Sequence, residues 1–177
     1  SLSTIVLHHP CNCGQGRALR TGINFFLEKT NFEYLITFDA DGQHYPLDAL
    51  KMLNFAVFNK CDAVFGSRFL DKNSARKMPF IRKITLKIAN HFERIFLGLN
   101  LTDSHNGLRV LNRKSCKLLK RMKSAEMAHA SEFAKILKNK TIYLDEFPVR
   151  VDYSSKIKKS QSPLSSLNII SDLMQGK

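Results

Sequence analysis

Two carboxylates, Asp39 and Asp41, stand one residue apart directly after the apolar run of YLITFDADGQHYP, residues 34–46. If the chain stays extended there, side chains two residues apart point to the same side, so both carboxylates can meet one cation. Gln43 follows two residues later and can add a neutral oxygen. Oxygen ligands are those that Mg²⁺ and Mn²⁺ prefer. The pattern indicates a divalent-cation site, with a solvated turn that caps the next helix as the alternative.

A glycine-containing turn is a second candidate for chemistry. In NCGQGRALRTG, Gly14 and Gly16 precede an amphipathic run and are followed by Arg17 and Arg20. Backbone amides at a helix start attract phosphate, and arginine side chains add positive charge there. The segment therefore predicts a phosphate contact, with an ordinary glycine turn before a helix as the alternative.

Alternating strands and helices are expected to position these residues. Short apolar segments at 4–9, 33–41 and 61–69 have the composition of strands, and residues 46–60 predict a helix with Pro46 in its first turn. A further helix is expected between the first two strands, at the amphipathic run. Such alternation predicts an α/β domain with a mainly parallel sheet. Ligands of open α/β sheets collect at the carboxyl ends of strands, where the acidic pair would lie.

The second half of the chain is more basic. Residues 76–98 predict one long helix that is both apolar and cationic and ends at Gly98. The expected elements beyond it are a short strand and a basic helix within 101–122, a helix at 128–140, a strand at 141–153, a mobile basic loop at 155–163 and an amphipathic helix at 164–177.

Length, charge and cysteine content limit the possible classes. A chain of 177 residues predicts a single domain, 1–177. Its 28 Lys and Arg against 15 Asp and Glu give a net charge of +13, which favours anionic partners. The four cysteines show no zinc-binding spacing and are expected to be reduced thiols. Neither a signal peptide nor an apolar run of transmembrane length is present in the sequence.

The ordered set of motifs resembles family 2 glycosyltransferases, and within them the branch of dolichol-phosphate mannose synthases and polyprenyl-phosphate glycosyltransferases. The motifs are NCGQGRALRTG, FDADGQH, DAVFGSRF, TDSHNGLRVLNR, ASEF and FPVRVDYSS. The resemblance implies the GT-A fold, a Rossmann-like mixed and mainly parallel sheet flanked by helices. It also implies a nucleotide-sugar donor, a divalent Mg²⁺ or Mn²⁺ ion, and transfer with inversion at the anomeric carbon.

On the donor side, the resemblance implies roles for three segments. Asp39, Ala40 and Asp41 form the Asp-x-Asp motif that binds metal and diphosphate, with Gln43 as a further metal ligand. The cation would stabilise the negative charge that grows on the leaving diphosphate. The other expected donor-side residues are Asn12, Gly14 and Arg17 beside the nucleotide, and Lys156 and Lys159 on the basic loop, which would close over the diphosphate.

On the acceptor side, the resemblance places Asp103 in the family's acceptor motif, with Arg109 close behind it as a donor-binding residue, and Glu132 where an acid faces the acceptor. Asp103 would be the general base for a hydroxyl acceptor. A lipid phosphate is already anionic, so the same carboxylate would then orient cations or metal. The alternatives are a helix or turn cap for Asp103 and a surface helix carboxylate for Glu132.

The leading prediction is a metal-assisted inverting glycosyltransferase acting on a polyprenyl-phosphate or saccharide acceptor. It would lie in the cytoplasm, bound at the inner face of the cell membrane through anionic lipid. By the resemblance, an earlier strand and an acidic nucleoside-binding segment are expected to precede this chain, which would make it N-terminally truncated. The alternatives are a basic nucleic-acid-binding module, although no nucleic-acid-binding motif is legible, and an inactive fragment that retains only the fold. The sugar, the base and the acceptor stay open.

Overall fold

The computed structural model describes residues 4–98, 100–122, 129–138 and 141–153. A four-stranded sheet forms its centre, in the order β1-β3-β2-β4. Its strands are β1 (Tyr34–Thr37), β2 (Ala63–Ser67), β3 (Arg109–Asn112) and β4 (Leu144–Pro148).

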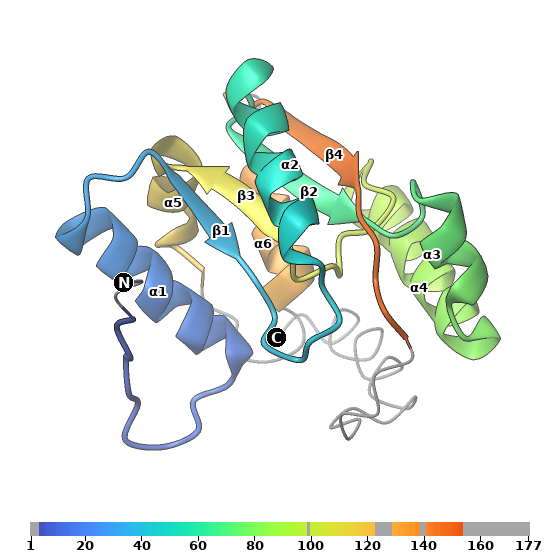
Figure 1. Ribbon diagram of the computed structural model, residues 1–177, viewed down its shortest axis with the longest axis horizontal. Coiled ribbons are helices and arrows are strands. Elements are labelled where there is room, and N and C mark those ends of the chain that lie inside the picture. Colours follow the sequence, from blue (N-terminus) through green and yellow to red (C-terminus); the bar gives the residue numbers. More distant parts are fainter. Residues whose placement is uncertain (1–3, 99, 123–128, 139–140, 154–177) are drawn as a thin grey trace.

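Three strands of this sheet run in one direction. β2 and β4 pair in parallel, whereas β3 lies antiparallel between β1 and β2. In Figure 1 the arrowhead of β3 accordingly points opposite to the others. The sheet is therefore mixed, and the predicted α/β class is confirmed. The expectation of a mainly parallel sheet holds for strand directions, although two of the three direct pairings are antiparallel.

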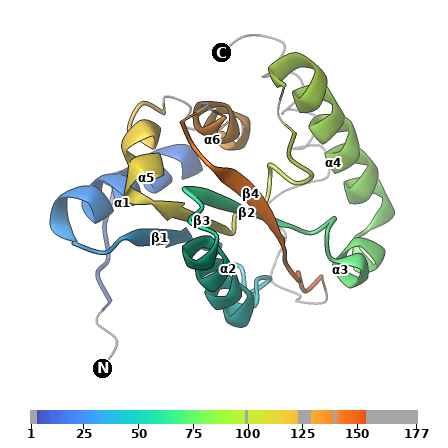
Figure 2. The same ribbon diagram turned by 90° about the horizontal axis from the view of Figure 1, so that it is seen from above.

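Helices cover both faces of the sheet. One face carries α1 (Gln15–Lys29), α5 (Arg113–Leu119) and α6 (His129–Leu137), and the other carries α2 (Pro46–Phe58), as Figures 1 and 2 show. Because side chains alternate along β2, Phe65 packs with the first group of helices and Val64 packs against α2. Both faces of β2 are buried, which explains its continuous apolar sequence.

Two further helices lie beside the end of β2, away from the sheet faces (Figure 2). α3 (Lys72–Lys77) is followed by α4 (Phe80–Phe92), which continues as a π-helical turn, η1 (Glu93–Leu97). The single helix predicted for 76–98 is therefore wrong at its start. Pro79 disfavours helical geometry at the residue before it, and Met78 is extended, with φ −65° and ψ 132°. The predicted end at Gly98 is confirmed, since Gly98 adopts φ 62°.

The strand predicted at 4–9 is absent from the structure. This segment has no regular secondary structure and pairs with none of the described strands, and Ile5, Val6 and Leu7 are exposed. A strand needs a hydrogen-bonded neighbour, and strand composition alone does not supply one. The predictions for 155–163 and 164–177 fall outside the described residues, and the single domain stays a prediction.

Candidate active site

The sheet brings four segments together at one edge. β1, β2 and β4 end there and β3 begins there, so Asp39, Arg68 and Tyr153 follow three strand ends, and Gly107 precedes β3. This is the carboxyl edge at which α/β sheets collect ligands. The acidic pair was predicted to lie beyond the end of its strand, and the structure has it there, after β1.

Asp39 is held close against the loop that precedes β3. A Cβ added to Gly107 would lie 2.0 Å from Oδ2 of Asp39, so only glycine leaves room for this carboxylate. Its Oδ1 accepts a hydrogen bond from Nε2 of Gln15 at 3.4 Å, and Oδ2 lies 3.6 Å from Nε2 of His44. Asp39 is therefore oriented by α1 on one side and by its own loop on the other.

Asp41 is exposed in the same turn, and Ala40 between the two acids is exposed as well. Its Oδ1 accepts the backbone N–H of Gln43 at 3.0 Å, and Gly42 between them adopts φ 73°. This local bond orients the Asp41 side chain within the turn.

The acidic turn is anchored to the segment that follows β4. His44 forms an antiparallel bridge with Val151, and the carbonyl of Gln43 accepts the backbone N–H of Asp152 at 2.9 Å. The ring of His44 also meets that of Phe38 edge-on, with centroids 5.7 Å apart. The position of the turn is therefore set by β4 as well as by β1.

The donor set around this turn fits a hard divalent cation that shares its ligands with phosphate. Asp39 and Asp41 supply carboxylate oxygens, as Mg²⁺ and Mn²⁺ prefer. Within the described ranges, however, no three His, Cys, Asp or Glu side chains converge as a metal-binding group. A cation held here would need further oxygens from a ligand, which a diphosphate provides.

Asp103 is fully buried and pairs with Arg68. Nε and one terminal nitrogen of Arg68 each donate to a different oxygen of the carboxylate at 2.6 Å, and the backbone N–H of Arg68 donates at 3.0 Å. Burial alone would lower the pKa of Arg68, but the charge of Asp103 and its hydrogen bonds outweigh burial and raise it. Asp103 is thus paired with the guanidinium of Arg68, and both roles predicted for it at the acceptor stay predictions.

A second arginine lies beside this pair. The guanidinium of Arg82, from α4, lies 5.8 Å from the ring centroid of Tyr153. Desolvation and the charge of Arg68 lower the pKa of Arg82, while the negative charges of Asp103 and Asp41 act in the opposite direction. Arg68, Arg82 and Tyr153 are here called the arginine cluster, and within it Arg82 feels the charge of Asp41 in the acidic turn.

Arg109 is buried beneath the site. Only 2% of it is exposed, and its guanidinium packs over the rings of Phe133 at 4.5 Å and Phe65 at 5.2 Å. One terminal nitrogen donates to the carbonyl of Ser104 at 3.2 Å, and burial lowers the pKa of Arg109 to about 10. Arg109 thus supports the 103–107 loop from below, and its predicted contact with a donor stays a prediction.

Glu93 fixes the same loop from the side of the π-helical turn. It is buried and accepts hydrogen bonds from the hydroxyls of Ser104 and Ser131, and Nε2 of His105 lies 3.1 Å from its Oε1. Burial alone would raise the pKa of Glu93, but these hydrogen bonds and the charge of His105 lower it. The loop that carries Asp103 is therefore bound to both η1 and α6.

The other predicted residues take varied positions. Oδ1 of Asn12 accepts the backbone N–H of Gly14 at 3.0 Å, where the chain turns with φ 81° into α1. Arg17 is exposed on α1, and Glu132 is partly buried on α6. Lys156 and Lys159 lie outside the described residues.

Sequence reasoning assigned no separate role to Arg68 or Glu146. Arg68 stands directly after a predicted strand in DAVFGSRF, a position that could have singled it out. Glu146 lies within β4 and accepts the backbone N–H groups of Thr102 and Asp103 at 2.9 and 3.1 Å, and burial raises its pKa. Nothing in the strand pattern of 141–153 distinguishes this carboxylate.

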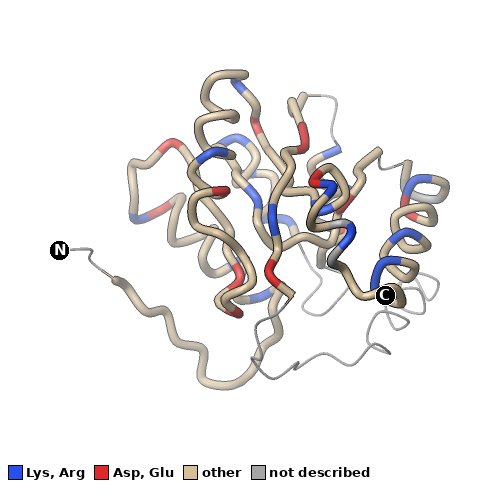
Figure 3. Tube along the Cα trace, turned by 45° about the vertical axis from the view of Figure 1, so that its right-hand side comes forward, with Lys and Arg blue, Asp and Glu red and all other residues tan. Residues whose placement is uncertain are grey.

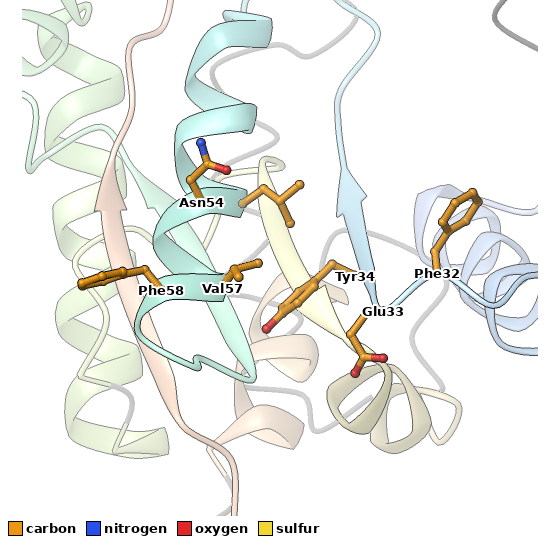
Figure 4. A pocket seen from close by; sticks show the side chains of 7 residues that line it. Phe32, Glu33, Tyr34, Asn54, Val57 and Phe58 are labelled. Carbon is orange, nitrogen blue, oxygen red and sulfur yellow. The ribbon is translucent and has the colours of Figure 1, made fainter.

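An apolar pocket of about 470 Å³ lies elsewhere, between the start of β1 and the end of α2 (Figure 4). It contains none of the predicted site residues. Its lining residues are Phe32, Glu33, Tyr34, Leu53, Asn54, Val57 and Phe58.

Comparison with known proteins identifies related chains. The family model described as glycosyl transferase family 2 matches residues 2–119. The chain is 33% identical to an uncharacterized protein of Methanocaldococcus jannaschii over 175 residues, which make up 98% of this chain and 72% of that protein.

Several relatives carry the names of enzymes, the following two among them. The chain is 28% identical to the UDP-N-acetylglucosamine–dolichyl-phosphate N-acetylglucosaminyltransferase of Methanococcus voltae, over 85% of the chain and 60% of the relative. It is 31% identical to the polyprenol monophosphomannose synthase of Mycolicibacterium smegmatis, over 62% of the chain and 40% of the relative. The chain thus spans less than two thirds of either named enzyme. Among the described residues, none of the helices is long and apolar enough to cross a bilayer.

Proposed function

Because the chain belongs to glycosyl transferase family 2, we propose that it moves a sugar from a nucleotide-diphosphate donor to a polyprenyl phosphate, with inversion at the anomeric carbon. The names of two relatives, which mention dolichyl phosphate and polyprenol, support this acceptor class. One observation carries the proposal: an acidic turn after β1 and an arginine cluster after β2 and β4 lie at the same sheet edge.

The acidic turn is proposed to hold the donor diphosphate. Asp39 and Asp41 would bind Mg²⁺ or Mn²⁺, with Gln43 as the third proposed ligand, and the bound cation would neutralise charge on the leaving diphosphate. The hydrogen bond from the backbone N–H of Gln43 orients Asp41, and Gln15 and His44 orient Asp39. On the same side, Asn12, Gly14 and Arg17 would contact the nucleotide and Lys156 and Lys159 would cover the diphosphate.

The arginine cluster is proposed to receive the acceptor phosphate. Asp103 already accepts three hydrogen bonds from Arg68, which leaves it poorly placed to take a proton from a hydroxyl acceptor. A phosphate oxygen is a nucleophile without such a base. The arrangement therefore favours a lipid phosphate over a saccharide, with Asp103 as the residue that orients Arg68 and Glu132 as a second acceptor-side carboxylate.

The outer side of α4 is proposed to rest on an anionic membrane, at the cytoplasmic face. Five apolar residues of α4 and η1 are exposed to solvent: Phe80, Ile81, Ile84, Ile88 and Ile95. Lys and Arg are spread along the same helix, as Figure 3 shows, and Lys87 is exposed. A mixed apolar and cationic helix surface suits the headgroup region of a bilayer. Arg82 on this helix would then meet a phosphate at the membrane surface.

Transfer to a lipid acceptor tests the proposal directly. The protein would be supplied with polyprenyl phosphate in anionic vesicles, Mn²⁺, and each of several radiolabelled nucleoside-diphosphate sugars, including UDP-N-acetylglucosamine. We expect labelled lipid with at least one donor, and its loss in Arg82→Ala but not in the control Lys51→Ala, which lies on α2. Absence of both transfer and metal-dependent nucleotide binding would contradict the proposal.

A further inference from the structure

Two thiols lie side by side in the exposed segment before α1, and the proposed transfer uses neither. Sγ of Cys11 and Sγ of Cys13 are 3.6 Å apart. Cys11 is exposed and Cys13 is partly exposed, whereas Cys61 and Cys116 are fully buried on opposite faces of the sheet. Of the four cysteines, this pair alone combines proximity with access from solvent.

A metal site does not explain the pair. Two thiolates need further ligands to enclose zinc or a comparable ion. In the described part of the chain, no third His, Cys, Asp or Glu joins them as a metal-binding group. Nε2 of the nearby His9 forms a hydrogen bond with the hydroxyl of Thr21, at 2.9 Å.

We propose that Cys11 and Cys13 form a reversible dithiol–disulfide site. The oxidant is a low-molecular-weight disulfide such as oxidised glutathione. One thiolate of the pair attacks it, the S–S bond of the oxidant breaks, and one small thiol leaves. The second cysteine then attacks the mixed disulfide and releases the other small thiol. The protein loses two hydrogen atoms, and the oxidant gains them as two thiols.

The geometry favours this closure. The two sulfurs must approach from 3.6 Å to about 2.05 Å, which is a small movement. Residues 11–13 belong to no helix or strand, so no regular backbone hydrogen bonds resist it. The hydrogen bond with Cys13, together with the charge that Cys13 would carry, raises the pKa of Cys11. The pair therefore resists losing both protons at once.

Closure would change the proposed donor side, and this step rests on the proposed function. Asn12 lies between the two cysteines, and its Oδ1 accepts the backbone N–H of Gly14. Gly14 leads into α1, whose first residue, Gln15, donates to Asp39 at 3.4 Å. A disulfide across Asn12 therefore alters the turn that places Gln15 against the acidic turn, and we expect weaker donor binding.

Mass spectrometry tests the site without reference to activity. The reduced protein would be equilibrated in glutathione buffers of increasing oxidised fraction, alkylated, and digested with trypsin. Both cysteines fall in one tryptic peptide, residues 1–17. We expect this peptide to lose two hydrogen atoms in oxidising buffer and to recover them with a reductant. Cys61 and Cys116 are buried, so they should react with the alkylating agent only after the protein is unfolded. Cys13→Ala should instead hold one glutathione on Cys11. Lack of the internal disulfide in fully oxidised buffer, or disulfide-linked dimers in its place, would overturn the proposal.

Nucleotide binding tests the coupling. We expect the oxidised protein to bind a nucleoside diphosphate with Mn²⁺ about tenfold more weakly, which corresponds to about 1.4 kcal/mol. The Cys11→Ala, Cys13→Ala double variant should show one affinity in both buffers. Equal affinity of the reduced and oxidised protein would overturn the coupling. If the reduced protein binds no nucleotide at all, the proposed function fails, whereas the mass measurement still decides the disulfide site.

Discussion

Arg68 and Asp103 form a buried ion pair in which the backbone and two side-chain nitrogens of Arg68 donate to one carboxylate. The pair joins the end of β2 to the loop that enters β3, and Asp103 is completely buried. It therefore fixes both the arginine cluster and the loop that lies against Asp39.

Loss of the negative charge at Asp103 should destabilise the fold. Asp103→Asn leaves the buried guanidinium of Arg68 without a counter-charge, which typically costs about 3–5 kcal/mol. Urea unfolding would measure the change in the free energy of unfolding. The control is Lys114→Ala, which breaks a half-exposed pair with Asp62 and should cost less than about 1 kcal/mol. Similar losses in the two variants would contradict the structural role of the Arg68–Asp103 pair.

The same variant separates the two mechanisms for the acceptor. With a hydroxyl acceptor, loss of a general base lowers the rate by about 10²–10⁴-fold. With a polyprenyl phosphate no base is required, and we expect Asp103→Asn to lower single-turnover transfer only moderately. Temperature would be set low enough that the variant is folded. If the fully folded variant transfers sugar to polyprenyl phosphate at a severely lowered rate, a general-base role for Asp103 would be favoured.

Metal binding should depend on the nucleotide. Two carboxylates make a weak cation site, so Mn²⁺ is expected to bind Asp39 and Asp41 chiefly when a nucleoside diphosphate completes its ligands. Titration calorimetry should show that Mn²⁺ strengthens nucleotide binding, and that Asp41→Ala abolishes the gain. The exposed Glu28, which pairs with Lys120 in a surface contact, provides the matched control Glu28→Ala. An undiminished metal effect in Asp41→Ala would count against the assignment.

Contact with a membrane should depend on charge and on salt. Each basic residue near an anionic surface contributes about 1 kcal/mol, and salt screens this attraction. We expect sedimentation with vesicles that contain anionic lipid, weaker binding at higher salt, and a further loss in the Lys83→Gln, Lys87→Gln double variant. Lys51→Gln, on α2, serves as the control. If binding to vesicles does not depend on salt or on lipid charge, or if no binding occurs, the membrane proposal is wrong.

The carboxylate of Glu93 should position the Asp103 loop. Glu93→Gln removes a charge that accepts from Ser104 and Ser131 and lies beside His105. We expect slower transfer at unchanged vesicle binding, because the variant loosens the loop and leaves the outer face of α4 intact. Glu28→Gln makes the same change at an exposed carboxylate on α1 and is the control. Equal rates in the two variants would show that the hydrogen bonds of Glu93 do not matter for transfer.

Acid should weaken the link between α2 and the segment after β4. Asp48 accepts hydrogen bonds from the backbone and side chain of Arg150. Burial alone would raise the pKa of Asp48, but Arg150 outweighs burial and lowers it. A pKa lowered by folding adds stability above the unfolded value of about 3.9, and this is lost as the pH falls through the folded value.

Unfolding in urea at neutral pH and at about pH 3 would measure this loss. The free energy of unfolding of the native protein should fall further between the two conditions than that of Asp48→Asn. Parallel losses would show that Asp48 does not contribute to acid sensitivity.

Local patterns in the sequence were enough for the fold class and for the acidic turn. Strand and helix periodicity predicted α2, β1 and β2 near their observed places, because side-chain burial follows the period of each element. The position of Asp39 directly after an apolar strand predicted that it lies at the carboxyl edge of the sheet, where the structure has it. The motifs and their order identified the family, which the match over residues 2–119 confirms.

Tertiary structure alone decided which of these residues meet. Arg68 and Asp103 are 35 positions apart, and the sequence around either residue does not predict that the other is its partner. The burial of Arg109 between two aromatic rings and the lack of a described sheet neighbour for residues 4–9 likewise depend on how distant segments pack. Sequence periodicity reports which face of an element is buried, because that is a local property. The partner on the other side of that face is set by the arrangement of all the elements together.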